Sequence, residues 1–182
     1  CQSTYVVNGE EQETMVREAE KCAHWFDQLV CGTPLLTSQE DLEAVARAIE
    51  AEFSGLSSEE ALVLVGHGTR HSANTAYAAL EYVFHDHGAC NIFVGTVESS
   101  PGLSSVLRQV DRLKPQKVTI APLMVVAGEH ARNDMAGERH SWKAALEERG
   151  YPVQAILKGL GEYPGIRAVY AAHARQAAEQ LQ

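Results

Sequence analysis

The sequence predicts an α/β protein built on a parallel sheet with helices on both faces. Two observations predict this fold class. Residues 61–65 form a short, continuously apolar run, which is typical of a strand buried on both faces of a sheet. Further runs of this kind alternate with segments whose apolar residues recur at helical spacing. Right-handed crossovers between parallel strands then place all these strands in one sheet, with helices on either side.

Spacing and helix-start signals predict each element in turn. The segment 1–9 is expected to be a strand, and 11–30 carries apolar residues at helical spacing. A second helix is expected over 37–53, and it opens with a capping-box pattern, Thr-Ser-Gln-Glu. After a polar break the expected elements are strand 61–65, helix 72–84, strand 91–97, helix 103–113, strand 117–123, a long loop, helix 141–148, strand 153–157 and helix 166–181.

Composition and charge exclude several classes of function. The net charge of −9 argues against a nucleic-acid-binding protein, which would carry a basic stripe. No apolar run approaches the roughly 20 residues that cross a bilayer, so no membrane span is expected. The four cysteines show no CxxC spacing and are expected to be reduced thiols. We therefore expect a cytoplasmic protein, with the periplasm left open because the chain begins with Cys1 rather than Met.

Three strand ends supply side chains that bind metals. His67 follows the strand 61–65 within Gly-His-Gly-Thr, Glu98 follows the strand 91–97, and His130 lies in the long loop after the strand 117–123. Ligands of open parallel sheets bind beyond the carboxyl ends of the strands, so these side chains are expected on one rim. Two imidazoles and a carboxylate suit cobalt, iron, nickel or zinc.

Each of these residues also has an ordinary structural interpretation. Gly-His-Gly-Thr is compatible with a tight turn that carries one exposed histidine. Glu98 precedes a helix, where a carboxylate stabilises the helix dipole. His130 could bond to Asp134 or another group of its own loop. The other six histidines, which are not expected to be primary ligands, are His24, His71, His85, His87, His140 and His173. The segment Asn8-Gly9-Glu10-Glu11 is interpreted as a turn followed by an acidic first helical turn.

Longer motifs resemble the class II chelatases, the family that contains the anaerobic sirohydrochlorin cobaltochelatases of the CbiK type. The resemblance runs nearly from end to end of the chain. The matching stretches are QSTYVVNGEE, CGTPLLTSQED, GHGTRH, GTVESSPG, APLMVVAGEHARNDMAG and KGLGEYPGIRAVYAAH.

The resemblance implies an enzyme of cobalamin biosynthesis that inserts Co²⁺ into sirohydrochlorin, in a cleft between two similar α/β domains. It implies that His67, Glu98 and His130 are the metal ligands, that His67 also accepts a proton, and that Glu11 faces them from the first domain. The metal is a substrate, so no separate cofactor is expected. The partner is a small tetrapyrrole; no nucleic acid or membrane is expected, and the apolar helix faces are compatible with a homo-oligomer.

Two features depart from the family pattern. Family members are longer at the N-terminus, so residues 1–58 are expected to be the remainder of an N-terminal domain. Residues 59–160 would be the C-terminal domain with the metal site, and 161–182 a C-terminal helix that packs on its own sheet or back on the first segment. Tyr5 replaces a histidine of some relatives, so haem binding through that position is not implied.

Several alternatives stay open on the sequence. Arg70, Arg132 and Arg139 lie near the rim and could hold substrate carboxylates or simply face solvent. A histidine phosphatase is disfavoured, because Gly66 stands where such enzymes carry an arginine. An iron or nickel chelatase of the same fold, or a non-catalytic protein that binds metal or tetrapyrrole, is compatible with the same residues.

Overall fold

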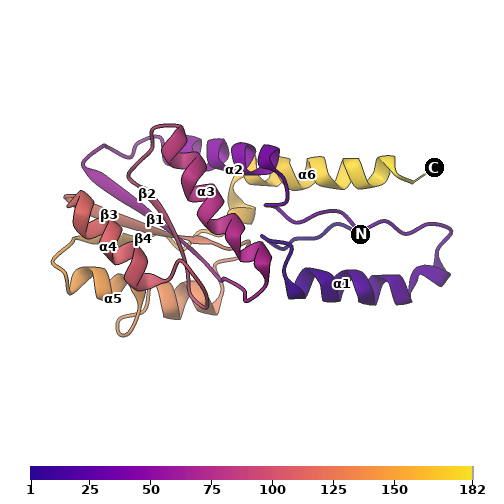
Figure 1. Ribbon diagram of the computed structural model, residues 1–182, viewed down its shortest axis with the longest axis horizontal. Helices are drawn as coiled ribbons and strands as arrows, with labels where there is room; N and C mark the ends of the chain where they lie inside the picture. Colours follow the sequence, from indigo (N-terminus) through magenta and orange to yellow (C-terminus); the bar gives the residue numbers. More distant parts are fainter. Residues whose placement is uncertain (182) are drawn as a thin grey trace.

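Within residues 1–181, a single parallel sheet of four strands organises the fold. The computed structural model describes residues 1–181, and its strands lie in the order β2-β1-β3-β4 (Figure 1). Their bounds are β1 Glu60–Gly66, β2 Ile92–Thr96, β3 Lys117–Leu123 and β4 Val153–Ala155. Gly66 pairs with Thr96 on one side and with Leu123 on the other, so three strands end at the same level. The predicted fold class is confirmed.

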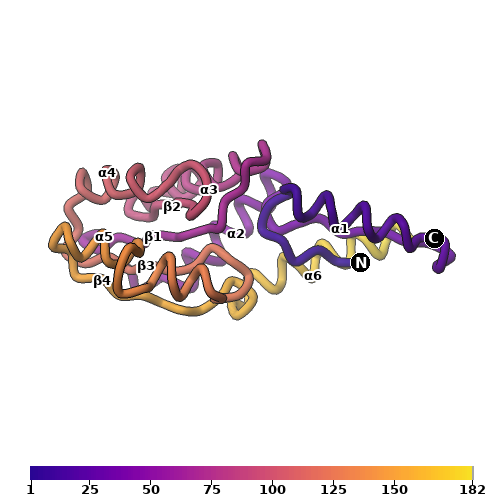
Figure 2. Tube along the Cα trace, turned by 90° about the horizontal axis from the view of Figure 1, so that it is seen from below, coloured from indigo at the N-terminus to yellow at the C-terminus, as the bar shows by residue number. Residues whose placement is uncertain are grey.

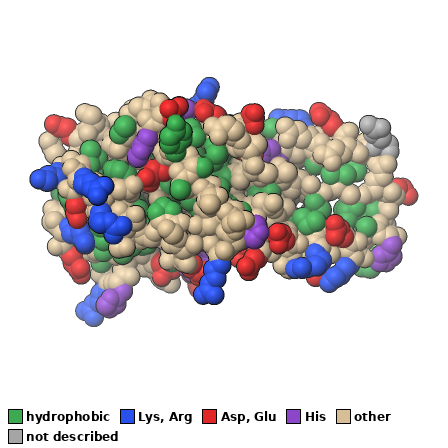
Figure 3. All heavy atoms as spheres, viewed as in Figure 1, with side chains coloured by type: hydrophobic (Ala, Val, Ile, Leu, Met, Phe, Trp, Pro, Cys, Tyr) green, Lys and Arg blue, Asp and Glu red, His purple; other side chains and the backbone are tan. Residues whose placement is uncertain are grey.

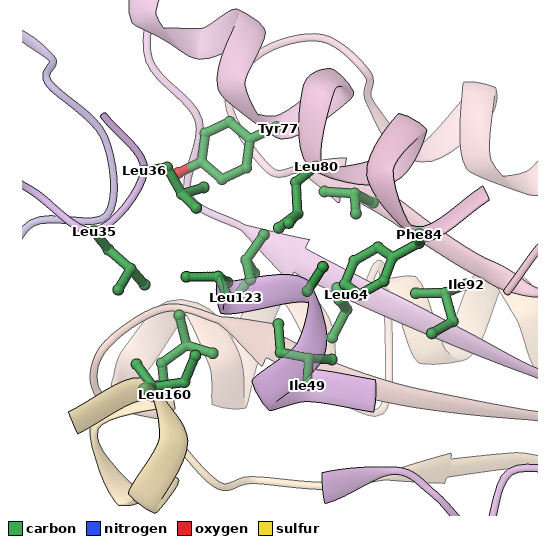
Figure 4. Close-up of a cluster of buried hydrophobic side chains, with 14 of the residues drawn as sticks. Leu35, Leu36, Ile49, Leu64, Tyr77, Leu80, Phe84, Ile92, Leu123 and Leu160 are labelled. Atoms are coloured by element: carbon green, nitrogen blue, oxygen red, sulfur yellow. The ribbon is translucent and has the colours of Figure 1, made fainter. Parts of the chain in front are cut away.

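Alternate residues of β1, β2 and β3 enter two separate cores. On one face, Leu62 and Leu64 pack with helices α2 (Gln39–Glu52), α3 (Thr75–Asp86) and α6 (Pro164–Glu179). Figure 4 shows this cluster, in which Ile49, Leu80 and Phe84 are fully buried.

The opposite face of the sheet is covered by shorter elements. Val63 and Val65 pack there with α4 (Leu103–Leu113), α5 (Trp142–Glu147) and η3, a single π-helical turn (Ala131–Met135). Both faces of the sheet are thus covered by helices, as expected for a parallel sheet. The bounds of α4 and β3 match the prediction, whereas β4 is two residues shorter than expected.

The N-terminal segment differs from its prediction. Residues 1–8 are extended but form only an isolated bridge, between Val7 and Leu36. Helix α1 (Glu10–Lys21) is followed by the short helical turn η1 (Ala23–Trp25), so the helix expected over 11–30 stops early. The reason is tertiary. Residues 30–36 run back beside residues 1–7, where the Leu35 and Leu36 N–H groups donate to the carbonyls of residues 5 and 6, at 3.0 and 2.8 Å. Pairing of this kind requires extended backbone.

Helices α1 and α6 extend beyond the sheet and enclose the N-terminal segment. Figure 1 shows them on opposite sides of it, and Figure 2 shows both reaching past the end of the sheet. The Tyr170 hydroxyl lies 3.2 and 3.1 Å from the carbonyl oxygens of Thr4 and Tyr5. The buried His173 contacts Asp41 at 2.7 Å. The last helix therefore contacts the first segment and the start of α2.

The N-cap of helix α2 lies one residue later than predicted. Ser38, rather than Thr37, is the N-cap, and its hydroxyl accepts from the Asp41 N–H at 3.1 Å. Asp41 accepts in return from the Ser38 N–H at 2.9 Å. The capping box is real, but its acidic member is Asp41 rather than Glu40.

No helix of residues 1–181 is long and apolar enough to span a bilayer.

His87 joins α2 to α3, and we expect it to make stability depend on pH. Its two ring nitrogens lie 2.9 Å from carboxylate oxygens of Glu50 and Glu43. These bonds, the one to Glu50 first, raise the pKa of His87. The stabilisation is therefore complete below the ordinary histidine pKa of about 6.5 and is lost as pH rises through the folded-state value. The melting temperature of wild type should exceed that of His87→Gln most near pH 6 and least near pH 9. A difference that does not change with pH would contradict this prediction.

Candidate metal centre

The three side chains predicted at the strand ends lie together in the structure. His67 follows β1, Glu98 follows β2, and His130 stands immediately before η3 in the loop after β3. One ligand atom from each residue lies within 4.8 Å of the other two. The two Nε2 atoms of the imidazoles are 3.3 Å apart, and the His67 Nε2 is 3.8 Å from the Glu98 carboxylate. The side chains of His67, Glu98 and His130 are 41, 55 and 44% exposed, so an ion from solvent can reach them.

Hydrogen bonds determine which nitrogen of each imidazole carries a proton. The His67 Nδ1 lies 3.0 Å from the Gly68 carbonyl oxygen, and the His130 Nδ1 lies 2.6 Å from the Asp134 carboxylate. Because both oxygens can only accept, both Nδ1 atoms must be protonated. In the neutral imidazoles the two Nε2 atoms then carry lone pairs that face each other.

Two facing lone pairs at this distance favour a cation between them. Without a shared proton or a metal ion, they repel each other. Two histidine nitrogens at about 2.1 Å from one tetrahedral ion would be about 3.4 Å apart, close to the observed distance. The arrangement therefore suits a divalent ion held by two nitrogens and the Glu98 carboxylate.

The turn between β1 and α3 positions His67. Gly68 has φ +87°, in the left-handed region, and a Cβ there would lie 2.8 Å from the Thr96 Cβ. The segments that follow β1 and β2 remain hydrogen-bonded to each other, because the Glu98 N–H donates to the His67 carbonyl at 2.9 Å. Glu98 is thus held beside His67. No side chain caps α4, whose N-cap is Gly102.

We expect Gly68→Ala to lower both stability and metal binding. The left-handed backbone costs a non-glycine residue about 1–2 kcal/mol, and the contact with Thr96 adds to this. Gly88 provides a matched control, since it has φ +89° but nothing lies within 4 Å of an added Cβ. Urea unfolding should show a larger loss for Gly68→Ala than for Gly88→Ala. Equal losses would mean that the turn accommodates the added methyl group.

A cavity of about 350 Å³ opens beside His67. Its walls come from the N-terminal segment, from α1 and α3 and from the ends of β1 and β3, and they include Tyr5, Glu11, Tyr77, Met124 and Val125. Glu11 therefore lies in the same cavity as His67, although it is not part of the three-residue group. Burial raises the pKa of Tyr77 to about 12, and the nearby Glu11 carboxylate contributes to that rise. Tyr77 is therefore a neutral phenol at pH 7.

The remaining predicted residues lie away from the three ligands or face solvent. The His71 Nε2 is 3.3 Å from the Glu13 carboxylate, which links the β1–α3 turn to α1. Arg70, Arg132 and Arg139 are exposed. His140 lies outside the helices, just before α5, with φ +54°. Figure 3 shows the densest group of basic side chains at the end of the molecule farthest from the projecting ends of α1 and α6.

Two residues that line or support the site were not singled out from the sequence. Tyr77 falls within the expected helix 72–84, and nothing in the sequence pattern marks it. For Asp134 the sequence predicts only a bond that would give His130 a structural role. Its bond to His130 spans i to i+4, and this spacing within His-Ala-Arg-Asn-Asp was the available signal.

The chain has an α/β fold with three candidate metal ligands at its strand ends, and this fold resembles that of two solved structures. SirB from Bacillus subtilis with Fe³⁺ superposes with a TM-score of 0.67 at 14% identity, over 97% of this chain and 70% of that one. DR2241 from Deinococcus radiodurans, described as similar to chelatases, gives a TM-score of 0.52 at 20% identity, over 74% and 30%. At these identities the likeness concerns the fold alone.

Sequence comparison identifies the family. Residues 1–179 match the cobalt chelatase (CbiK) family, and the chain belongs to it. It is 39% identical to the sirohydrochlorin cobaltochelatase of Salmonella typhimurium, over 97% of this chain and 67% of the relative. It is 33% identical to the sirohydrochlorin cobaltochelatase CbiKC of Nitratidesulfovibrio vulgaris, over 99% and 65%. The chain thus spans about two thirds of the length of these relatives.

Proposed function

We propose that this chain is a metal chelatase that inserts Co²⁺ into sirohydrochlorin. The observation that carries the proposal is the group formed by His67, Glu98 and His130, in which two imidazole lone pairs and a carboxylate converge. Membership of the cobalt chelatase family supports cobalt as the metal and sirohydrochlorin as the tetrapyrrole. Three protein ligands leave coordination positions open for incoming pyrrole nitrogens, unlike a closed structural site.

Insertion exchanges two pyrrole protons for one Co²⁺ ion. The two N–H bonds break, four nitrogen–cobalt bonds form, and two protons must be accepted. Because the His67 Nδ1 is already protonated, Nε2 is the only basic atom of that side chain. Nε2 cannot hold the ion and a proton together. We therefore propose that His67 first releases the ion to the macrocycle and then takes one proton, while Glu11 takes the other from the opposite wall.

The cavity beside His67 would receive the macrocycle. Its largely apolar wall, with Val7, Leu123, Met124 and Val125, suits a flat ring. Sirohydrochlorin also carries several carboxylates, which must find cations on a chain of net charge −9. The exposed Arg70, Arg132 and Arg139 are the candidates, since guanidinium binds carboxylate through paired hydrogen bonds. No cofactor beyond the metal substrate is required for this chemistry.

Visible spectroscopy tests the proposal directly. Sirohydrochlorin and Co²⁺ are mixed without oxygen, with and without catalytic amounts of the chain. We expect rapid conversion to the cobalt complex with wild type and its loss with His130→Ala. A stoichiometric spectral shift without turnover would overturn catalysis and favour a binding protein. Parallel runs with Fe²⁺ and Ni²⁺ test the choice of metal, and faster insertion of either one would overturn cobalt.

A further inference from the structure

We infer that Asp134 is a positioning residue that makes His130 the anchoring ligand of the metal centre, while His67 is the ligand that lets the ion go. The inference rests on the proposed function, because it divides roles within the same site. The observation behind it is an inequality between the two histidines. The His130 Nδ1–H donates to a carboxylate at 2.6 Å, whereas the His67 Nδ1–H donates to a neutral carbonyl at 3.0 Å.

The π-helical turn places Asp134 against His130. Ala131 and Met135, which begin and end η3, are fully buried in the core on that face of the sheet. The Ala136 N–H donates to the Ala131 carbonyl at 3.1 Å, the i to i−5 bond of a π-turn. His130 and Asp134 are four residues apart and their side chains are 44 and 45% exposed, so both lie on the solvent side of the turn. The burial of Ala131 and Met135 therefore fixes the loop and, with it, the position of the Asp134 carboxylate.

A charged acceptor and a neutral one have different effects on an imidazole. A carboxylate at Nδ1 draws the N–H proton toward itself and increases electron density at Nε2, which strengthens that nitrogen as a metal ligand. Charge-assisted bonds are also shorter and roughly twice as strong as neutral ones, in keeping with 2.6 Å against 3.0 Å. His130 is therefore both the better oriented and the stronger donor. His67 is the weaker donor and sits in the wall of the cavity.

This division suits a site whose metal is a substrate. The ion must bind tightly enough to be captured but must leave during each turnover. A pair of ligands in which one anchors and one releases meets both needs, and the releasing ligand is the one that borders the cavity. The Asp134 side chain is 45% exposed, so substitutions there leave no buried cavity.

The test measures Co²⁺ binding without any tetrapyrrole. The visible absorption of bound Co²⁺ is titrated anaerobically for wild type, Asp134→Asn, Asp134→Glu and Glu129→Gln. Asp134→Asn retains an acceptor for the Nδ1–H but loses its charge. Glu129→Gln removes the same charge from an exposed residue next to His130. We expect Asp134→Asn to bind Co²⁺ about 10–100-fold more weakly, with a shifted band at saturation, as is typical for loss of such a partner. Asp134→Glu should recover most of the affinity, and Glu129→Gln should change it less than threefold.

Three results would overturn the inference. The first is that Asp134→Asn binds Co²⁺ as tightly as wild type does. The second is that Glu129→Gln weakens Co²⁺ binding as much as Asp134→Asn does, which would leave only a general charge effect. The third is that wild type shows no absorption band of bound Co²⁺. If Asp134→Asn does not fold, Asp134→Glu and Asp134→Ser carry the same comparison. A failed insertion assay with intact Co²⁺ binding would overturn the proposed function alone. Unchanged binding in Asp134→Asn with active wild-type insertion would overturn this inference alone.

Discussion

His67→Ala is expected to lower kcat/KM for cobalt insertion by at least about 100-fold. The substitution removes one of three ligand atoms and also the proposed acceptor of a pyrrole proton. General-base catalysis by a side chain contributes about 10²–10⁴-fold on its own. The stability of the variant should stay near that of wild type, because the side chain is 41% exposed and its bond to Gly68 is local. The measurement is the initial rate of insertion at several concentrations of sirohydrochlorin.

A matched control separates this effect from damage to the turn. His71 lies four residues further along the same turn and contacts Glu13 rather than the ligand group. His71→Ala should therefore retain insertion within a few-fold of wild type. Insertion by His67→Ala at the wild-type rate would exclude His67 from both proposed roles. Equal losses in the two variants would indicate that the turn, rather than the imidazole, matters.

Trp142→Ala is expected to lower the free energy of unfolding by about 3–5 kcal/mol, the usual cost of removing a buried tryptophan side chain. Trp142 is 4% exposed at the start of α5 and belongs to the core that also holds Met135 of η3. Its ring lies against Gly95 of β2, where an added Cβ would collide with it. The cavity left by the substitution would open directly beneath the strand that leads to Glu98. Urea unfolding followed by circular dichroism measures the loss.

Two further variants show whether the fit between the ring and Gly95 causes the effect. Trp142→Phe retains much of the apolar contact and should lose less than Trp142→Ala. Gly95→Ala should destabilise wild type, because an added methyl group meets the ring, but should cost less in the Trp142→Ala background. Additive effects in the double variant would contradict direct contact. A loss below about 1 kcal/mol for Trp142→Ala would show that this core repacks freely.

Local pattern was enough to predict most of the C-terminal part of the chain. The run 61–65 is a strand because uninterrupted apolar residues suit only a strand buried on both faces, and β1 extends it by one residue at each end. Helix α4 matched its prediction because its apolar spacing is regular and a turn follows it at Lys114, φ +54°. Over residues 11–30 the same reasoning failed. Phe26, which lies in the segment 11–30 expected to be helical, is 55% exposed, because the chain there leaves the helix to run back beside residues 1–7.

The sequence by itself determined the parallel α/β fold and the three side chains at the strand ends. Those features depend on local periodicity and on the rule that parallel strands present their carboxyl ends at one edge. The tertiary structure alone decided the 3.3 Å approach of the two imidazoles and the unequal partners of the two Nδ1 atoms. Such features arise where segments distant in the chain meet, and no local pattern records the orientation of one side chain toward another.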